Sequence, residues 1–290
     1  SRGAGRALDR TAGTADRTAG TMSSLPLLVQ PENLEDSLSC GNVLIVDLSK
    51  RETYGQLHIP GAVHLDYAQI VAASKPVMGL VPDDATLASV FSALGIDNDT
   101  HVIAYDDEGG GRAARLLWTL EVAGHRQGSL LNGGLHAWAN EGHPHDHAPV
   151  TPVPAHFIVR RDERPCADHD YIHAHLGDAD YCLLDVRSPA EFTGMKKFAD
   201  RGGHIPGAVN LEWTEVMDKT HNLRLKPDRE LADMFAAVGA TPDREIITYC
   251  QTHHRSAHTY IVLRHLGYER VKGYPGSWSY WGNHPELPVE

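Results

Sequence analysis

A cysteine with several polar neighbours stands at a strand-to-helix turn in the C-terminal half of the chain. The apolar run from Ile246 to Tyr249 precedes Cys250 and is typical of a buried strand, and the positions from Ala257 to Leu266 predict a helix. A cysteine at such a turn faces free backbone N–H groups and the positive end of the helix dipole, which favour the thiolate. We therefore expect a nucleophilic sulfur held by backbone amides. The turn also contains Gln251, Thr252, His253, His254, Arg255 and Ser256.

Two other interpretations of these residues are open. A free cysteine is often a buried structural side chain, but Cys250 ends a strand and six polar residues follow it. His253 and His254 could also be metal ligands beside Cys250. Adjacent residues in a tight loop rarely converge on one ion, and the pattern suggests no further ligands. We expect a reactive thiol and no metal or organic cofactor.

Length and charge limit the classes of protein to which the chain can belong. Its 290 residues, 41% of them hydrophobic, are enough for two compact domains. The formal net charge is -12 and no basic run interrupts it, which argues against nucleic acid as a partner. No apolar stretch reaches the roughly 18 residues of a membrane span, so we expect no membrane partner.

The cysteines and the N-terminal residues indicate where the protein works. Four cysteines occur without a C-x-x-C pair, so neither a zinc knuckle nor a dithiol redox motif is present. A reducing cytoplasm is the simplest location, and it would keep Cys250 free to react. Residues 1–21 lack the apolar core of a secretory signal. We expect an expression-vector leader there, with the natural start at Met22.

The two halves of the chain repeat one pattern of residues. The segment from His58 to Ala62 returns almost unchanged from His204 to Ala208. The segment ending in Tyr105 and Asp106 aligns with Tyr249 and Cys250, 144 residues later. Such a repeat predicts a duplicated domain of about 120 residues. Strands alternate with helices in each copy, which predicts an α/β fold with two tandem domains, each a mostly parallel sheet flanked by helices.

The repeat also sets the domain boundaries and assigns the chemistry to one copy. We expect a first domain at residues 22–145, a proline-rich linker at 146–156 and a second domain at 157–290. Ligands of parallel sheets lie at the carboxyl ends of the strands, where both Asp106 and Cys250 stand. A carboxylate cannot form a persulfide, so we expect the first domain to be inactive. A phosphate cradle after Asp106 is disfavoured because the P-loop lysine is absent.

Several separate segments resemble the rhodaneses, or thiosulfate sulfurtransferases, and the resemblance covers both copies, roughly residues 25–290. It rests on the segments Gly203 to Ala208, Asp185 to Phe192 and Lys272 to Trp278, together with the Cys250 turn. The sequence Cys-Gln-Thr-His-His-Arg resembles a group of two-domain bacterial rhodaneses. The resemblance implies an inactive first domain and a catalytic second domain. Asp185 and Arg187 are carried over as a supporting pair, with a surface ion pair as the alternative.

The family implies a two-step transfer in which Cys250 takes the outer sulfur of thiosulfate and becomes a persulfide. Cyanide, a thiol or a protein acceptor would then remove that sulfur. The substrate and the persulfide are anionic, so the amides from Gln251 to Ser256 should point inward. Arg255 should fix the shape of the loop or assist in binding the anion.

Two departures from the family pattern affect substrate choice. Many vertebrate-type rhodaneses have a substrate-binding arginine where this chain has Glu191, and basic residues where it has Gln251 and Thr252. Anion binding is then left to the amides, Arg255 and any protonated histidine of the turn. The Cys-Gly-Ser/Thr-Gly loop associated with mercaptopyruvate sulfurtransferases is absent, so that substrate is less expected.

Two rival functions remain open. Phosphatases of the same superfamily space Cys and Arg as C-x5-R, whereas Cys250 and Arg255 enclose four residues. This tighter loop suits a single sulfur atom rather than a phosphate. The second rival is a sulfur-carrier or binding module that delivers the persulfide sulfur to a protein partner. It needs the same cysteine, so the sequence does not separate it from transfer to a small molecule.

Overall fold

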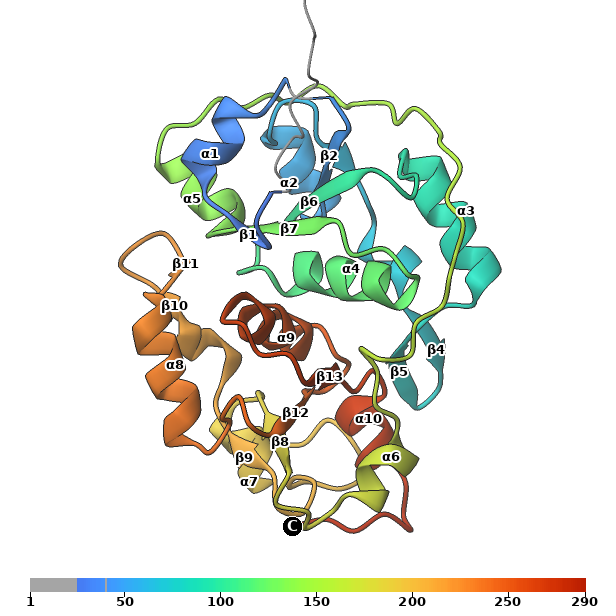
Figure 1. Cartoon of the computed structure of the whole chain (residues 1–290). Coiled ribbons are helices and arrows are strands. Elements are labelled where there is room, and N and C mark those ends of the chain that lie inside the picture. Colours follow the sequence, from blue (N-terminus) through green and yellow to red (C-terminus); the bar gives the residue numbers. More distant parts are fainter. Residues whose placement is uncertain (1–24, 40) are drawn as a thin grey trace, which may run out of the picture.

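Two α/β domains follow one another along the chain and lie one above the other in Figure 1. The structure, a computed structural model, describes residues 25–39 and 41–290. The expected leader at 1–21 and the expected start at Met22 lie outside the described residues. The predicted fold class is confirmed, because each domain contains a parallel sheet with helices packed against it.

The first domain is built on a five-stranded parallel sheet with the order β1-β7-β6-β2-β3. Its central strands are nearly continuous apolar runs because helices cover both faces. A short antiparallel hairpin, β4–β5, projects from this domain. Its strands are β1 (Leu28–Val29), β2 (Val43–Asp47), β3 (Val63–His64), β4 (Ala72–Ser74), β5 (Val77–Leu80), β6 (His101–Tyr105) and β7 (Gly128–Leu131). Its helices are α1 (Pro31–Asp36), α2 (Arg51–Gln56), η1 (Tyr67–Ile70), α3 (Asp84–Leu94), α4 (Gly111–Val122) and α5 (Gly134–Asn140).

The second domain repeats this arrangement with a four-stranded parallel sheet of order β13-β12-β8-β9. It also projects a short antiparallel hairpin, β10–β11. Its strands are β8 (Tyr181–Asp185), β9 (Val209–Asn210), β10 (Met217–Asp218), β11 (Arg224–Leu225), β12 (Glu245–Tyr249) and β13 (Val271–Gly273). Its helices are α6 (His169–Ala174), α7 (Pro189–Thr193), η2 (Trp213–Val216), α8 (Asp228–Ala237), α9 (Arg255–His265) and α10 (Ser277–Trp281).

Equivalent hydrogen bonds in the two domains support the duplication inferred from the sequence. The hydroxyl of Tyr105 accepts the N–H of Ile59 at 3.0 Å, and the hydroxyl of Tyr249 accepts the N–H of Ile205 at 3.1 Å. These bonds join the end of a central strand to the repeated His-Ile-Pro-Gly-Ala segment. The strand end that precedes Asp106 in the first copy and Cys250 in the second is therefore held in the same way.

Helix boundaries differ from the sequence expectation by about two residues. The helix expected from Ala257 begins at Arg255, and its counterpart in the first domain begins at Gly111, 144 residues earlier. Arg255 and Ser256 therefore belong to the first helical turn. Such ends are decided by the hydrogen bonds of the first and last turns, which apolar periodicity does not show.

The linker predicted at residues 146–156 contains no helix or strand and runs along the outside of α3 (Figure 1). The N–H of Ala155 donates to the carbonyl of Ser92 at 2.9 Å, and Phe157 packs against Phe91. The segment is therefore attached to the first domain along its length.

The domains contact each other through equivalent elements. Helix α4 packs against helix α9 in the middle of the molecule (Figure 1). Hairpin β4–β5 of the first domain reaches α10 of the second, where Met78 N–H donates to the hydroxyl of Ser279 at 3.0 Å. Hairpin β10–β11 crosses in the opposite direction, and Leu225 N–H donates to the side-chain oxygen of Asn132 at 2.8 Å. Each domain therefore holds its partner with one hairpin and one helix.

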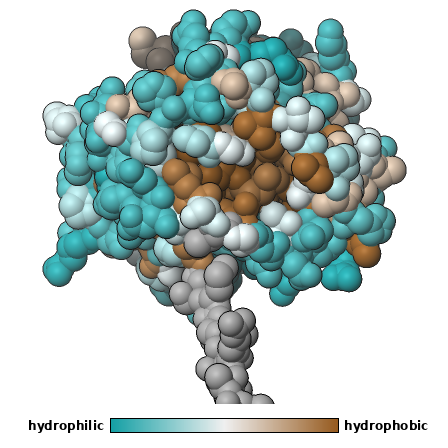
Figure 2. All heavy atoms as spheres, turned by 90° about the horizontal axis from the view of Figure 1, so that it is seen from above, coloured by the Kyte–Doolittle hydropathy of each residue, from teal (hydrophilic) through white to brown (hydrophobic). Residues whose placement is uncertain are grey.

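The face of the first domain that points away from the second is shown in Figure 2. Apolar side chains gather near the middle of this face and are surrounded by hydrophilic ones. Across residues 25–39 and 41–290, no helix combines the length and the apolar character that crossing a membrane requires.

Candidate active site

Cys250 lies directly after strand β12 and begins the loop that enters α9. The residue is buried, with 0% of its surface exposed. Its N–H donates to the hydroxyl of Ser277 at 3.2 Å, and Ser277 in turn donates to the carbonyl of Tyr274 at 2.7 Å. These bonds fix the backbone from which the thiol projects.

Two donors of the loop point at the sulfur atom. The N–H of His253 lies 3.2 Å from Sγ of Cys250, and the hydroxyl of Ser256 lies 3.3 Å from it. The same hydroxyl is 2.6 Å from Nδ1 of His253. If Nδ1–H donates to Ser256, the serine proton is free to donate to the sulfur, so this tautomer of His253 suits a thiolate. His253 adopts a positive φ of 59°, a strained conformation that turns its amide inward.

The carbonyl groups of the loop point away from the sulfur and are held from outside. The first two bind the N-terminal turn of α10: Cys250 C=O accepts the N–H of Trp278 at 2.9 Å, and Gln251 C=O accepts that of Ser279 at 3.0 Å. With its carbonyls turned outward, the loop can present its amides to one point. Successive amides arranged in this way form an anion-binding nest.

The next two carbonyls bind an arginine of the other domain. Nη1 of Arg115, on helix α4, donates to the carbonyls of Thr252 at 3.2 Å and His253 at 3.0 Å. Its Nη2 donates to the carbonyls of Gly79 at 2.7 Å and Leu80 at 3.3 Å in hairpin β4–β5. The active loop is therefore enclosed by both domains.

The surroundings of Cys250 favour its ionised form. Burial raises the pKa of the thiol, but the guanidinium of Arg255, the Ser256 hydroxyl and the amides of Ser256 and Thr252 lower it. The balance leaves the pKa of Cys250 below its ordinary value. The thiolate is the nucleophilic form of cysteine, so the loop prepares the sulfur for attack.

Arg255 forms an ion pair with the residue that replaces the arginine of vertebrate-type rhodaneses. Its Nη1 and Nη2 donate to the two carboxylate oxygens of Glu191 at 2.9 and 3.1 Å. Burial raises the pKa of Glu191, but Arg255, Ser188 and Arg187 together outweigh this effect, so the pKa lies below its ordinary value. Glu191 remains charged and pairs with Arg255. The guanidinium of Arg255 still lowers the pKa of Cys250, while both of its terminal nitrogens donate to Glu191.

The sequence left open whether protonated histidines add positive charge to the pocket, and the surroundings of both rings disfavour protonation. Burial lowers the pKa of His253 well below its ordinary value, and Arg115 acts in the same direction. Burial and the nearby arginines lower the pKa of His254 to about 4. Both rings are neutral near pH 7, so they contribute shape and hydrogen bonds to the loop.

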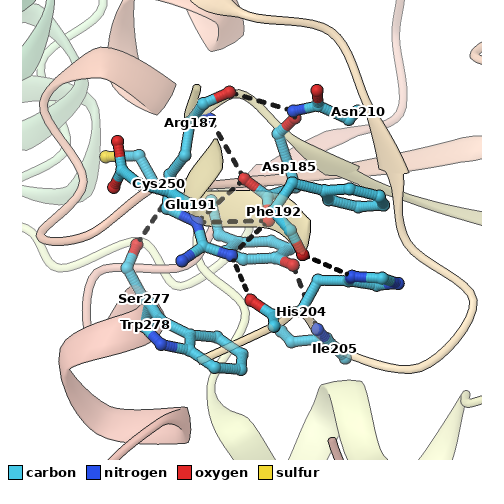
Figure 3. A network of polar contacts seen from close by, with 12 residues as sticks. Asp185, Arg187, Glu191, Phe192, His204, Ile205, Asn210, Cys250, Ser277 and Trp278 are labelled. Atoms are coloured by element: carbon cyan, nitrogen blue, oxygen red, sulfur yellow. Dashed lines mark hydrogen bonds and ion pairs between the residues drawn. The ribbon is translucent and has the colours of Figure 1, made fainter. Parts of the chain in front are cut away.

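Asp185 and Arg187 form a buried ion pair, shown in Figure 3, instead of the surface pair considered as an alternative. Nη2 of Arg187 lies 2.7 Å from Oδ2 of Asp185 and donates to the carbonyl of Gly203 at 2.7 Å. The guanidinium also lies 4.7 Å from the ring centroid of Trp278, whose backbone N–H donates to the carbonyl of Cys250. The pair therefore supports the elements beside the loop through Trp278.

The first domain has the same nest with a carboxylate inside it. Oδ1 of Asp106 accepts the N–H groups of Glu108 at 2.9 Å and Gly110 at 2.8 Å, and Oδ2 accepts that of Ala113 at 3.0 Å. Its backbone carbonyl binds the N–H of Leu135 in α5, as that of Cys250 binds α10. The side chain of Asp106 thus occupies the position where a bound anion would lie.

The remaining loop side chains predicted from the sequence point elsewhere. The amide of Gln251 donates to the carbonyl of Phe198 at 3.3 Å, and the hydroxyl of Thr252 lies 3.5 Å from Nδ1 of His254. Sequence reasoning missed Arg115 and Ser277. The one available signal for Arg115 is an arginine in the largely apolar segment Ala113 to Val122, whose other polar residues are Thr119 and Glu121.

The described part of the chain contains one group of side chains with the spacing of metal ligands, and it lies outside this site. It consists of Glu32, Glu141 and His143. Arg224 donates to the carboxylates of both glutamates and already compensates their charge. The residues around Cys250 do not form such a group.

Comparisons with known proteins identify the family of the chain. A thiosulfate sulfurtransferase of Pseudomonas aeruginosa is 43% identical over 268 residues, which are 92% of this chain and 98% of that protein. One of Azotobacter vinelandii is 44% identical over 268 residues, with the same coverage. The sulfur carrier protein TtuD of Thermus thermophilus is 32% identical over 277 residues, 91% of this chain and 96% of that protein. The family model of the rhodanese-like domain matches residues 30–141 and 168–284. The chain therefore belongs to the rhodanese-like domain family and contains two copies of its domain.

Proposed function

We propose that the protein is a thiosulfate sulfurtransferase that works through a persulfide on Cys250. The observation that carries the proposal is the thiol with a lowered pKa inside a nest of inward-pointing donors. Two relatives that align over 92% of the chain are thiosulfate sulfurtransferases. A thiolate in such a nest can attack sulfur, and the same donors can then hold an anionic persulfide.

The reaction has two balanced steps. In the first, the thiolate of Cys250 attacks the outer sulfur of thiosulfate, a new S–S bond forms, and the old S–S bond breaks with its electron pair leaving on sulfite. The persulfide carries one negative charge, which the amide of His253 and the hydroxyl of Ser256 are placed to bind. In the second step, cyanide attacks the outer sulfur, thiocyanate leaves, and the Cys250 thiolate returns.

Phosphatase activity is not favoured by the charges at the site. A phosphate dianion needs free donors in addition to backbone amides. Arg255 directs both of its terminal nitrogens to Glu191. Arg115 directs its terminal nitrogens to backbone carbonyls of the loop and of hairpin β4–β5. The pocket suits a small, weakly hydrated sulfur anion better than a phosphate ester.

Intact mass spectrometry of the full chain tests the proposal. Incubation with thiosulfate is expected to add one sulfur atom to the wild-type protein, and subsequent cyanide should remove it and release thiocyanate. Cys250→Ala should show no gain, whereas Cys182→Ala is a matched control, because Cys182 is a free, buried cysteine in strand β8. Mercaptopyruvate and a phosphate ester complete the panel. A sulfur gain that persists in Cys250→Ala would show that the assignment of the nucleophile is wrong.

A protein acceptor is the second candidate, and it is favoured by a segment beside the loop. One residue separates α2 from His58 in the first domain, whereas residues 194–203 separate α7 from His204 in the second. In this longer segment Met195 is 87% exposed and Phe198 is 58% exposed. The carbonyl of Phe198 accepts the side-chain N–H of Gln251, so the segment adjoins the active loop. Exposed apolar side chains beside a reactive site are typical of a docking surface.

The charge of the segment suggests an acidic acceptor. Lys196 and Lys197 are exposed in a chain of net charge -12, and Nζ of Lys196 lies 5.1 Å from the ring centroid of Phe198. A thiol flanked by acidic residues would be attracted to this cationic, apolar surface. A relative at 32% identity is a sulfur carrier protein. The reducing cytoplasm predicted from the cysteines would supply such thiols and suits the free Cys250.

Peptide acceptors separate the two candidates. A cysteine peptide with aspartate on both sides is expected to have a several-fold lower KM than the same peptide with lysine. Lys196→Glu with Lys197→Glu should reverse this order and leave the cyanide reaction unchanged, because cyanide does not need the segment. Equal KM values for both peptides in the wild type would favour a small-molecule acceptor.

A further inference from the structure

Arg115 is the buried cation of the first domain that touches the active loop of the second. It has 0% exposure and lies in α4, where nearly all side chains are buried. Across the described residues it forms no ion pair with a carboxylate. Its hydrogen bonds go to the carbonyls of Thr252, His253, Gly79 and Leu80, and its Nε donates to the hydroxyl of Thr119 at 3.2 Å.

A charged side chain without a carboxylate partner is costly to bury unless its donors are fully used. In Arg115 each terminal nitrogen donates to two carbonyls, and its guanidinium lies 5.0 Å from the ring centroid of Trp118. A lysine has the same charge but places its donors on a single nitrogen and cannot reach both pairs of carbonyls in this way. The geometry of the contact therefore requires an arginine.

Of the two equivalent loops, Arg115 contacts the one in the catalytic domain. The position equivalent to Arg115 in the second domain, 144 residues later, is Thr259 on helix α9. The hydroxyl of Thr259 is buried and forms no hydrogen bond within the described residues. The two domains thus differ at two pairs of equivalent positions: Asp106 in the first corresponds to Cys250 in the second, and Arg115 in the first corresponds to Thr259 in the second. The loop that receives the arginine is the loop with the nucleophile.

We propose that Arg115 is a positioning residue of the active site, through which the first domain shapes the loop of the second. The guanidinium holds the carbonyls of Thr252 and His253 outward. Because each peptide group is planar, an outward carbonyl at Thr252 turns the following N–H, that of His253, towards the sulfur. The inference rests on the proposed sulfur transfer, in which this N–H binds the thiolate and the persulfide.

Hairpin β4–β5 also contacts both the guanidinium of Arg115 and the active loop. Gly79 lies so close to the loop that a Cβ built on it would be 2.0 Å from the carbonyl oxygen of Thr252. The backbone of Gly79 also has a φ of +75°, which a side chain disfavours. A side chain at this position would displace the Thr252 carbonyl without altering Arg115. The glycine offers an independent way to disturb the contact.

The test measures how the rate of Cys250 alkylation by iodoacetamide depends on pH, in the full chain, together with kcat and KM for thiosulfate and cyanide. In Arg115→Met, alkylation at pH 6 should fall at least about tenfold because the thiolate pKa rises. The value of kcat should fall about a hundredfold, as for a misplaced catalytic group. Arg115→Lys should restore part of the alkylation rate and little of kcat. Gly79→Ala should lower both the alkylation rate and kcat, as Arg115→Met does.

Arg224→Met is the matched control. Arg224 also joins the two domains, through Glu32 and Glu141, but it lies in hairpin β10–β11, and none of its hydrogen bonds reaches the active loop. Its loss should lower the unfolding temperature and leave the pH dependence of alkylation unchanged. A folded Arg115→Met protein with wild-type alkylation and kcat would overturn the proposal. If that variant does not fold, wild-type behaviour of both Arg115→Lys and Gly79→Ala would overturn it equally.

Alkylation does not depend on the identity of the sulfur donor, so the two proposals can fail separately. If the wild type forms no persulfide but the variants still change the pKa of Cys250, the proposed function fails and the positioning role stands. If the persulfide forms and the variants leave alkylation and kcat unchanged, the positioning role fails alone.

Discussion

The hydroxyl of Ser256 should set much of the reactivity of Cys250, and Ser256→Ala removes it with little change in volume. Both residues are fully buried, and the hydroxyl lies 3.3 Å from the sulfur and lowers its pKa. A hydrogen bond to a charged group contributes roughly 1.5–3 kcal/mol. At about 1.36 kcal/mol per pKa unit, its loss should raise the pKa of Cys250 by about one to two units.

The expected consequence is a lower fraction of thiolate in the acidic part of the pH range. At a pH below the wild-type pKa, each unit of increase lowers that fraction about tenfold, so persulfide formation there should slow about ten- to a hundredfold. At a pH well above the new pKa the difference should shrink, because both proteins are then ionised. Stopped-flow measurement of persulfide formation from pH 5 to pH 10 would show both the slower rate at low pH and the smaller difference at high pH.

A second effect of Ser256→Ala acts on stability and has to be separated. The hydroxyl also pairs with Nδ1 of His253, which has 0% exposure and would lose its partner. Leaving such a group unpaired costs about 1–3 kcal/mol. Ser129→Ala is the matched control, since Ser129 is a fully buried serine of strand β7 bound to His101. A folded Ser256→Ala protein with the wild-type pH profile would refute the role of the hydroxyl.

Three further predictions concern the charges around the two loops. Glu191→Gln should release Arg255 to bind anions, so the KM for thiosulfate should fall several-fold and depend more strongly on salt; an unchanged KM would contradict this role of Glu191. His254→Gln should leave the pH dependence of kcat/KM between pH 5 and 8 unchanged, because the pKa of His254 is about 4 and the ring is already neutral in this range. The rise of activity with pH then reflects the ionisation of Cys250. A change in the pH profile between pH 5 and 8 would show that His254 is not neutral there. Asp106→Cys combined with Cys250→Ala should produce no thiocyanate, because Gly111 stands at the position equivalent to Arg255; measurable thiocyanate would show that the first nest suffices.

The sequence predicted features that depend on local pattern. The duplication, the parallel sheets and the place of Cys250 follow from apolar periodicity and from the repeated His-Ile-Pro-Gly-Ala segment. These features involve residues that are close in the chain or repeated at a constant spacing.

Contacts between the domains were not predictable in this way. Arg115 lies 137 residues before Thr252, and a pattern of helix positions does not show which loop it meets. The neutral state of His253 and His254 depends on burial by the first domain as well as on neighbouring arginines. The partner of Arg255 is Glu191, which the sequence marked as a departure from the family without showing that the two residues pair. Each of these features depends on how the two copies pack together.

The complete burial of Cys250 has a consequence for resistance to oxidation. A thiol with a lowered pKa reacts readily with peroxides, and the product can proceed irreversibly to sulfinic and sulfonic acids. With 0% of the residue exposed, the folded structure shields this sulfur from oxidants in the solvent. Limited access therefore protects the thiol against the reactivity that its neighbours confer.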